Sequence, residues 1–316
     1  MARVYLARVD EPTADSLTAA VERARAWLGN PCLSGDVSTV AAPRWGRLSR
    51  RDVGQLVRSL TGRPDERPRF IGRSGEILRY QLSVGEDRLH DQLPARAELY
   101  RVHGLLLAPV LSLDLAAGGV GGAVLLAARR LVQVRAEQQD LHAWGQTLAE
   151  VLEVATADLV IGDGTTARVG LSPRTLPQPL GLVLVADDAL AHDATWARIL
   201  GLDPAAIPWM ARAAEAGLGQ IDGLEIHGDE PLAFFRRRVQ GYARSACSLE
   251  EFAGGWARDH GLALPIEVVP CRRRTVGADR VLRWLAALAD EPKLREQLPG
   301  QPTVAVLAGA RATSAL

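Results

Sequence analysis

The alternation of apolar and polar residues predicts both strands and helices along this chain. Positions 3–8 alternate as a strand does, and the helically spaced apolar stripe from Leu17 to Leu28 ends at Gly29, a stop signal. Further helices are expected over 49–60, 88–99 (interrupted at Pro94), 123–132, 141–154, 248–260 and 281–288. Further strands are expected near Phe70 and over 102–107, 159–161, 182–185, 266–269 and 303–307.

Strand and helix patterns alternate most clearly between positions 157 and 228. Such alternation is typical of βαβ units, so we predict an α/β fold with a mostly parallel sheet flanked by helices. Beyond Glu230 the chain becomes arginine-rich. We therefore divide it into an α/β core domain at 1–235 and a C-terminal α/β appendage at 236–316, which packs on the core or serves assembly.

Composition narrows the function classes. Lysine plus arginine and aspartate plus glutamate number 37 each, which disfavours nucleic acid as a partner. A single lysine, abundant arginine and alanine point to a GC-rich bacterial source. The apolar segment 104–128 is interrupted by Pro109 and Asp114, so a buried strand, a glycine loop and a helix explain it better than a membrane span.

Cysteine usage and the first residues favour the cytoplasm. The three cysteines are scattered and form no Cys-x-x-Cys, so we expect neither disulfides nor an iron–sulfur cluster. The opening MARVYLARVDEP lacks the apolar core of a signal peptide. We expect no cofactor and assign no metal ligands, although a divalent metal and a homodimer stay open.

Carboxylates near expected strand ends are the strongest candidates for chemistry. Asp163 follows one apolar run, while Asp187 and Asp188 follow the next. Ligands of α/β proteins gather at the carboxyl ends of strands, and grouped carboxylates hold cations or raise one another's pKa. Candidate catalytic residues are Asp163, Asp188, Asp193 and Asp114. Candidate substrate-binding residues are Arg168, Thr165, Asp187, His192 and His103.

Each candidate also has a structural interpretation. Asp187 or Asp188 can cap the following helix. Adjacent residues of a helix point about 100° apart, so His192 and Asp193 are not expected to form a preset pair, and His192 is expected to cap or to face solvent. Asp114 faces either a polar cleft or an arginine, because a buried unpaired carboxylate is costly. The glycine run at 118–122 either binds an anion or allows close packing of a helix on the sheet.

The segment from about 155 to 230 resembles the prokaryotic family called domain of unknown function 362. The resemblance rests on Asp163-Gly164, on the run from Ala186 to Asp193, on Gly201-Leu202-Asp203-Pro204, and on Ala213 to Gly219. That family often carries a ferredoxin-type cluster module, whose cysteines this chain lacks, and its Pro-Lys-Leu-Lys-Thr-His segment reads here Pro109 to Asp114 without the lysines and histidine. The resemblance implies a divergent, cluster-free member.

Two functions of different class follow from these observations. The first is a cofactor-independent small-molecule enzyme with acid–base chemistry of the isomerase, lyase, cyclase or hydrolase type, working in bacterial specialised biosynthesis. The alternative is a non-catalytic accessory or scaffold protein that keeps the family fold.

Overall fold

A computed structural model describes most of the chain up to Val239 and two later strands. The described residues are 1–29, 37–41, 58, 69–71, 75–82, 89–101, 104–113, 120–132, 141–168, 178–239, 266–270 and 304–308. The predicted helices over 49–60, 248–260 and 281–288 lie outside these residues, apart from Arg58, which is helical.

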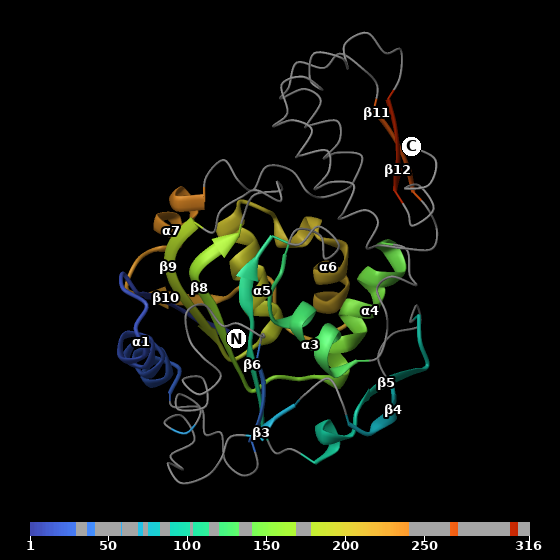
Figure 1. Ribbon diagram of the computed structural model, residues 1–316, viewed down its shortest axis with the longest axis horizontal. Helices are drawn as coiled ribbons and strands as arrows, with labels where there is room; N and C mark the ends of the chain where they lie inside the picture. Colours follow the sequence, from blue (N-terminus) through green and yellow to red (C-terminus); the bar gives the residue numbers. More distant parts are fainter. Residues whose placement is uncertain are drawn as a thin grey trace.

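One mixed sheet organises the described part (Figure 1). Its strands are β1 (Arg3–Arg8), β2 (Val37–Ala41), β3 (Arg69–Phe70), β6 (Gly104–Ala108), β7 (Val110–Ser112), β8 (Leu159–Arg168), β9 (Gln178–Ala186) and β10 (Glu225–Gly228). The order is β10-β1-β9-β8-β6-β2-β3, with β7 continuing the pairing to β8 after Pro109 interrupts β6. Only β9 runs against the others, so the mostly parallel α/β sheet predicted from the sequence is confirmed for the described residues.

Helices cover both faces of this sheet. They are α1 (Ala14–Trp27), α3 (Ala123–Leu131), α4 (Leu141–Val154), α5 (Ala189–Leu200), α6 (Pro208–Glu215) and α7 (Leu232–Val239), with short 3₁₀ turns η1 (Ala97–Tyr100) and η4 (Pro204–Ala206). Helix α1 packs its apolar stripe on one face, against side chains such as Ile161 and Val183. Helices α3 to α7 bury theirs in the larger core on the other face, and Figure 1 shows α1 and the group α3 to α6 on opposite sides of the strands.

The helical pattern predicted several boundaries well. Strand β1 and helix α4 have the predicted limits, and α1 ends where Gly29 adopts a positive φ of 80°. In α4 the predicted inward residues Trp144, Leu148 and Val151 are buried. These agreements follow because burial of one helical face dominates the stability of such helices.

One predicted helix is wrong. Residues 88–99 contain β5 (Gln92–Arg96), which pairs antiparallel with β4 (Ile77–Gln81), followed by η1. Within β5, Leu93 and Ala95 are buried while Pro94 is only half-buried, so the apolar positions alternate with a period of two. Proline is compatible with an edge strand but breaks a helix, which explains the outcome.

The C-terminal strands pair with each other. Strand β11 (Ile266–Pro270) lies parallel to β12 (Val304–Ala308), as a separate two-stranded sheet of the described residues. Both match predicted strands. Helix α7 spans the division that we placed after residue 235, and it buries Phe235 and Val239 in the main core.

Candidate functional site

Strands β8 and β9 carry the two groups of candidate aspartates to different edges of the sheet. Strand β8 does not end before Asp163 but continues to Arg168, and it pairs antiparallel with β9 so that Asp163 faces Val183. Asp187 and Asp188 follow the far end of β9, about 13–17 Å further along at 3.3 Å per residue. Asp163 and the Asp187–Asp188 pair therefore do not lie together at one end of the strands. Only nine residues separate Arg168 from Gln178, which suits an antiparallel connection and is too short for a parallel crossover.

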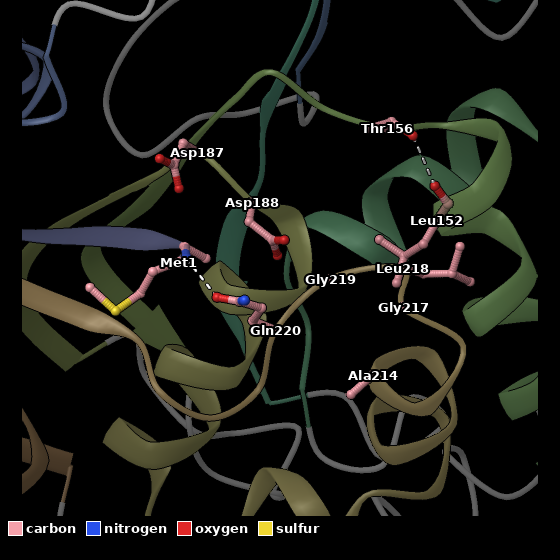
Figure 2. Close-up of a pocket in the computed structure, with 11 residues that line it drawn as sticks. Met1, Leu152, Thr156, Asp187, Asp188, Ala214, Gly217, Leu218, Gly219 and Gln220 are labelled. Carbon is pink, nitrogen blue, oxygen red and sulfur yellow. Dashed lines mark hydrogen bonds between the residues drawn. The ribbon is translucent and has the colours of Figure 1, made fainter.

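A large cavity lies where β9 ends and α5 begins (Figure 2). Its volume is about 760 Å³, and we call it the Asp188 cavity. Its lining residues come from the start of the chain, the end of α4, the turn before α5 and the segment after α6: Met1, Ala2, Leu152, Thr156, Asp187, Asp188, Ala214, Gly217, Leu218, Gly219 and Gln220. Two candidate residues, Asp187 and Asp188, thus meet in one cavity.

Asp188 is the N-cap of α5, as one interpretation of the sequence predicts. Its Oδ1 accepts the N–H of Ala191 at 2.6 Å. Gly219 packs against the same carboxylate, and a Cβ there would lie 3.0 Å from both Asp188 oxygens. Burial raises the pKa of the Asp188 carboxyl, and hydrogen bonds from backbone N–H groups oppose that rise. A carboxyl that holds its proton to higher pH while lining a cavity is able to act as a general acid or base.

The Asp187 carboxylate accepts two hydrogen bonds from Arg3 of β1. Its Oδ1 accepts the backbone N–H of Arg3 at 2.7 Å, and its Oδ2 accepts the Arg3 Nε–H at 2.9 Å. This bidentate pair joins the start of β1 to the end of β9. Asp187 therefore shapes the wall of the Asp188 cavity, with its charge balanced by arginine.

Asp193 lies outside the Asp188 cavity and caps a second helix. Its two carboxylate oxygens accept the N–H groups of Ala123 at 2.7 Å and Val124 at 3.0 Å, at the N-terminus of α3. A Cβ on Gly122 would lie 2.1 Å from Asp193 Oδ1, so only glycine permits this approach. The interpretation of the glycine run as a packing device is supported at Gly122, because the protein's own carboxylate takes the N–H groups that an anion would use.

His192 differs from its expected position. It is wholly buried, and its Nδ1 lies 2.7 Å from Asp193 Oδ1, so the two neighbours do form a pair and His192 does not face solvent. Its Nε2 packs against β8, where a Cβ on Gly162 would lie 2.3 Å away. The prediction considered only the directions in which the two side chains leave the helix. The side chains themselves are long enough for His192 Nδ1 to contact Asp193 Oδ1.

Asp163 lies on the opposite face of the sheet from His192. Its strand partner Val183 belongs to the core under α1, whereas Gly162 faces α5. Asp163 is 1% exposed, and its Oδ1 accepts the N–H and the Oγ–H of Thr165 at 2.9 and 2.7 Å. Burial raises the pKa of this carboxyl, although the Thr165 hydrogen bonds oppose the rise.

The structure does not describe the side chains of three other candidate residues. Asp114 and His103 lie outside the described residues, as does the side chain of Arg168. Among the described residues, no group of three or more histidine, cysteine, aspartate or glutamate side chains is arranged to hold a metal ion. Within the same residues, no helix is long and apolar enough to cross a membrane.

Sequence reasoning missed Gln220 as a lining residue. The Gln220 side-chain oxygen accepts the backbone N–H of Ala2 at 2.6 Å, which fixes the start of β1 beside the cavity. The sequence does contain an indication of this position, the Gly-Leu-Gly run directly before Gln220. We used that run only as evidence for the family resemblance. A glycine-rich turn directly after a helix indicates a close backbone approach, here of Gly219 to Asp188.

Comparisons with known proteins give one partial match. No family model matches the chain, and no solved structure matches it. The chain is 37% identical over 81 residues to the thylakoid-associated protein sll1697 of Synechocystis sp.. That stretch is 25% of this chain and 25% of the relative, so the chain spans about a quarter of the length of the curated relative that it matches. The resemblance to the domain of unknown function 362 family stays a prediction.

Proposed function

We propose that this protein binds a small molecule in the Asp188 cavity and uses the Asp188 carboxyl for proton transfer. Asp188 carries the proposal because it is the candidate carboxyl that both lines a cavity and has a raised pKa. The chemistry is then of the isomerase, lyase, cyclase or hydrolase type, which needs a positioned acid–base group and no redox cofactor.

The lining residues favour a ligand rich in hydrogen-bond donors. The described lining carries Asp187, Asp188, the Gln220 amide and the Thr156 hydroxyl, with no basic side chain among them. Asp187 is balanced by Arg3, which leaves Asp188 as the group to receive a ligand hydroxyl or amine. A polyol or an amine with a proton that Asp188 can remove fits this arrangement better than a phosphate does.

We further propose where the protein acts and how it assembles. The setting is a bacterial cytoplasm, with the protein taking part in a biosynthetic pathway and assembling as a homodimer. The arginine-rich, lysine-poor composition supports the bacterial source, and the scattered cysteines support the cytoplasm.

A non-catalytic accessory role is the second candidate. Asp193 caps α3, and the buried Asp163 carboxylate accepts hydrogen bonds from Thr165. Both carboxylates thus stabilise the fold, which favours a non-catalytic role. The partial relative is named a thylakoid-associated protein, a name that includes no reaction, which is compatible with this alternative.

A thermal-shift screen against polyols, amines, carboxylates, phosphates and nucleotides tests the first proposal. Ligand binding to the native state raises the melting temperature by mass action. We expect a polyol or an amine to stabilise the wild-type protein, and we expect Asp188→Asn to remove that stabilisation. Asparagine caps helices as well as aspartate does, so this variant keeps the fold.

Asp203→Asn is the matched control, because Asp203 caps η4 through the N–H of Ala205 and does not line the Asp188 cavity. Stabilisation that survives in Asp188→Asn and Asp203→Asn alike would refute the assignment of Asp188. No hit across the panel, together with stable co-purification of another protein, would favour the accessory role.

A further inference from the structure

A second cavity lies at the opposite edge of the sheet from the Asp188 cavity. Its volume is about 410 Å³. It is lined by Asp10, Glu11, Pro12, Thr13, Thr165, Thr166, Pro179, Gly181 and Arg238. These residues follow β1, end β8 and begin β9, so the cavity is at the carboxyl ends of the parallel strands. Ligands of open α/β sheets bind at this edge, and we call this space the carboxyl-edge cavity.

Arg238 is an exposed residue of α7 that lines this cavity and makes two contacts with the protein. Its Nη1 donates to the carbonyl oxygen of Leu180 at 2.9 Å, and its guanidinium carbon lies 5.3 Å from the centre of the Phe234 ring. Gly181 has a φ of 68°, and a Cβ there would lie 3.2 Å from Arg238 Nη1. These two contacts orient the guanidinium, and its remaining N–H groups are suited to a bidentate contact with a carboxylate.

Two further lining residues are acidic. Asp10 and Glu11 lie between β1 and α1, and Asp10 is paired with Arg8 Nε at 2.9 Å. Helix α1 begins here, but Thr13 and Ser16 close its N-terminus with a reciprocal capping box. The helix end is thus already satisfied, and Arg238 is the group of this cavity that attracts an anion.

Two threonines of β8 add hydroxyl groups to the lining. Thr165 donates its Oγ–H to Asp163, so towards the cavity its hydroxyl is an acceptor. Thr166, the next residue of β8, is half-buried and also lines the cavity. The lining of the cavity therefore combines a guanidinium, two carboxylates and threonine hydroxyls.

We propose that the carboxyl-edge cavity binds a small zwitterion of amino-acid size, with its carboxylate on Arg238 and its ammonium on Glu11, since Asp10 is already paired with Arg8. A phosphate or dicarboxylate would meet repulsion from the Glu11 carboxylate, and a simple amine would make no use of the Arg238 guanidinium. A ligand that carries both charges suits both side chains. The volume of about 410 Å³ is near the lower end for small-molecule sites, as an amino acid requires.

Calorimetric titration of the full chain with each common L-amino acid tests this site. The best binder is then compared with its N-acetyl derivative, which lacks the ammonium, and with its methyl ester, which lacks the carboxylate. We expect at least one amino acid to bind, and we expect each blocked derivative to bind at least about tenfold more weakly, as loss of a charge-assisted contact implies.

Arg238→Gln should weaken binding by about ten- to a hundredfold. Arg237→Gln is the matched control, because Arg237 is its exposed neighbour on α7 and does not line the cavity. Thr166→Val, which removes a hydroxyl while keeping the side-chain shape, should weaken binding to a smaller extent. Equal melting temperatures of the variants ensure that the comparison reports on binding.

Three results would overturn this inference: no amino acid binds, the N-acetyl derivative binds as well as its parent, or Arg238→Gln binds as well as Arg237→Gln. The Asp188→Asn variant should bind the amino acid normally. Failure here therefore leaves the function proposed for the Asp188 cavity standing, and the reverse also holds.

Discussion

Asp193 on α5 accepts the backbone N–H of Ala123, the first residue of α3, at 2.7 Å. With the second bond from Val124, one carboxylate joins two helices that are about 70 residues apart in the chain. Asp193 is wholly buried, and the hydrogen bonds to its two oxygens come from these N–H groups and from the neighbouring His192 ring. Asp193 is thus a cap for α3 that another helix supplies.

Removal of this cap should cost more stability than removal of a cap at the surface. Asp193→Ala leaves two buried N–H groups without an acceptor, so we expect a loss of about 3 kcal/mol in the free energy of unfolding. Asp203→Ala, which removes the exposed cap of η4, should cost at most about 1 kcal/mol. Urea unfolding of both variants measures the difference, and equal losses would contradict the role given to Asp193.

Gly162 should tolerate no side chain. Gly162→Ala places a methyl group against His192 Nε2 and Leu111 inside the core, and we expect it to cost at least about 2 kcal/mol. Gly145→Ala is the control, because its Cβ would meet only Trp209 at 3.8 Å within α4. That variant should range from neutral to about 1 kcal/mol more stable, since alanine favours helices. Thermal unfolding that ranks Gly162→Ala at or above Gly145→Ala would show that His192 is positioned differently.

Asp163 should make stability depend on pH. Burial raises its native pKa above the ordinary value of 3.8, so between these two values the native state keeps a proton that the unfolded state has lost. The contribution of Asp163 to the free energy of unfolding therefore falls as pH rises through this window.

Asp163→Asn lacks this titration and keeps an oxygen acceptor for Thr165. The stability of the variant relative to wild type should consequently increase as the pH rises from 3.8 through the native pKa of Asp163. Urea midpoints measured at a series of pH values across this window provide the measurement. A difference that stays constant, or that moves the other way, would mean that Asp163 is no harder to ionise in the folded protein than in the unfolded chain.

The fold was more predictable than the sites, for a physical reason. Helix α4 and strand β1 follow from apolar periodicity, which reports burial of one face. The order and direction of strands depend on pairing between distant segments. Strand β9 resembles any other buried strand in its sequence, and only the short connection after Arg168 indicates that it runs antiparallel to β8.

The candidate aspartates show the same limit. Residue type and nearness to a strand end identified Asp188 correctly as a helix cap, but they also grouped it with Asp163 and Asp193. The sheet separates Asp163 from the other two, and Asp193 is committed to α3. Separating these residues required the strand direction and the partner of each carboxylate, neither of which is encoded locally.

The most direct test of the Asp188 site is carboxyl NMR of protein labelled with ¹³C at aspartate, recorded while the polyol and amine panel is added. The resonances are assigned from Asp188→Asn and Asp163→Asn. We expect at least one compound to move the Asp188 resonance and to change its pKa, while the buried Asp163 resonance stays in place. If no compound moves Asp188, or if the compound that does so stabilises the Asp188→Asn protein equally, Asp188 is a helix cap alone and the proposed function is wrong.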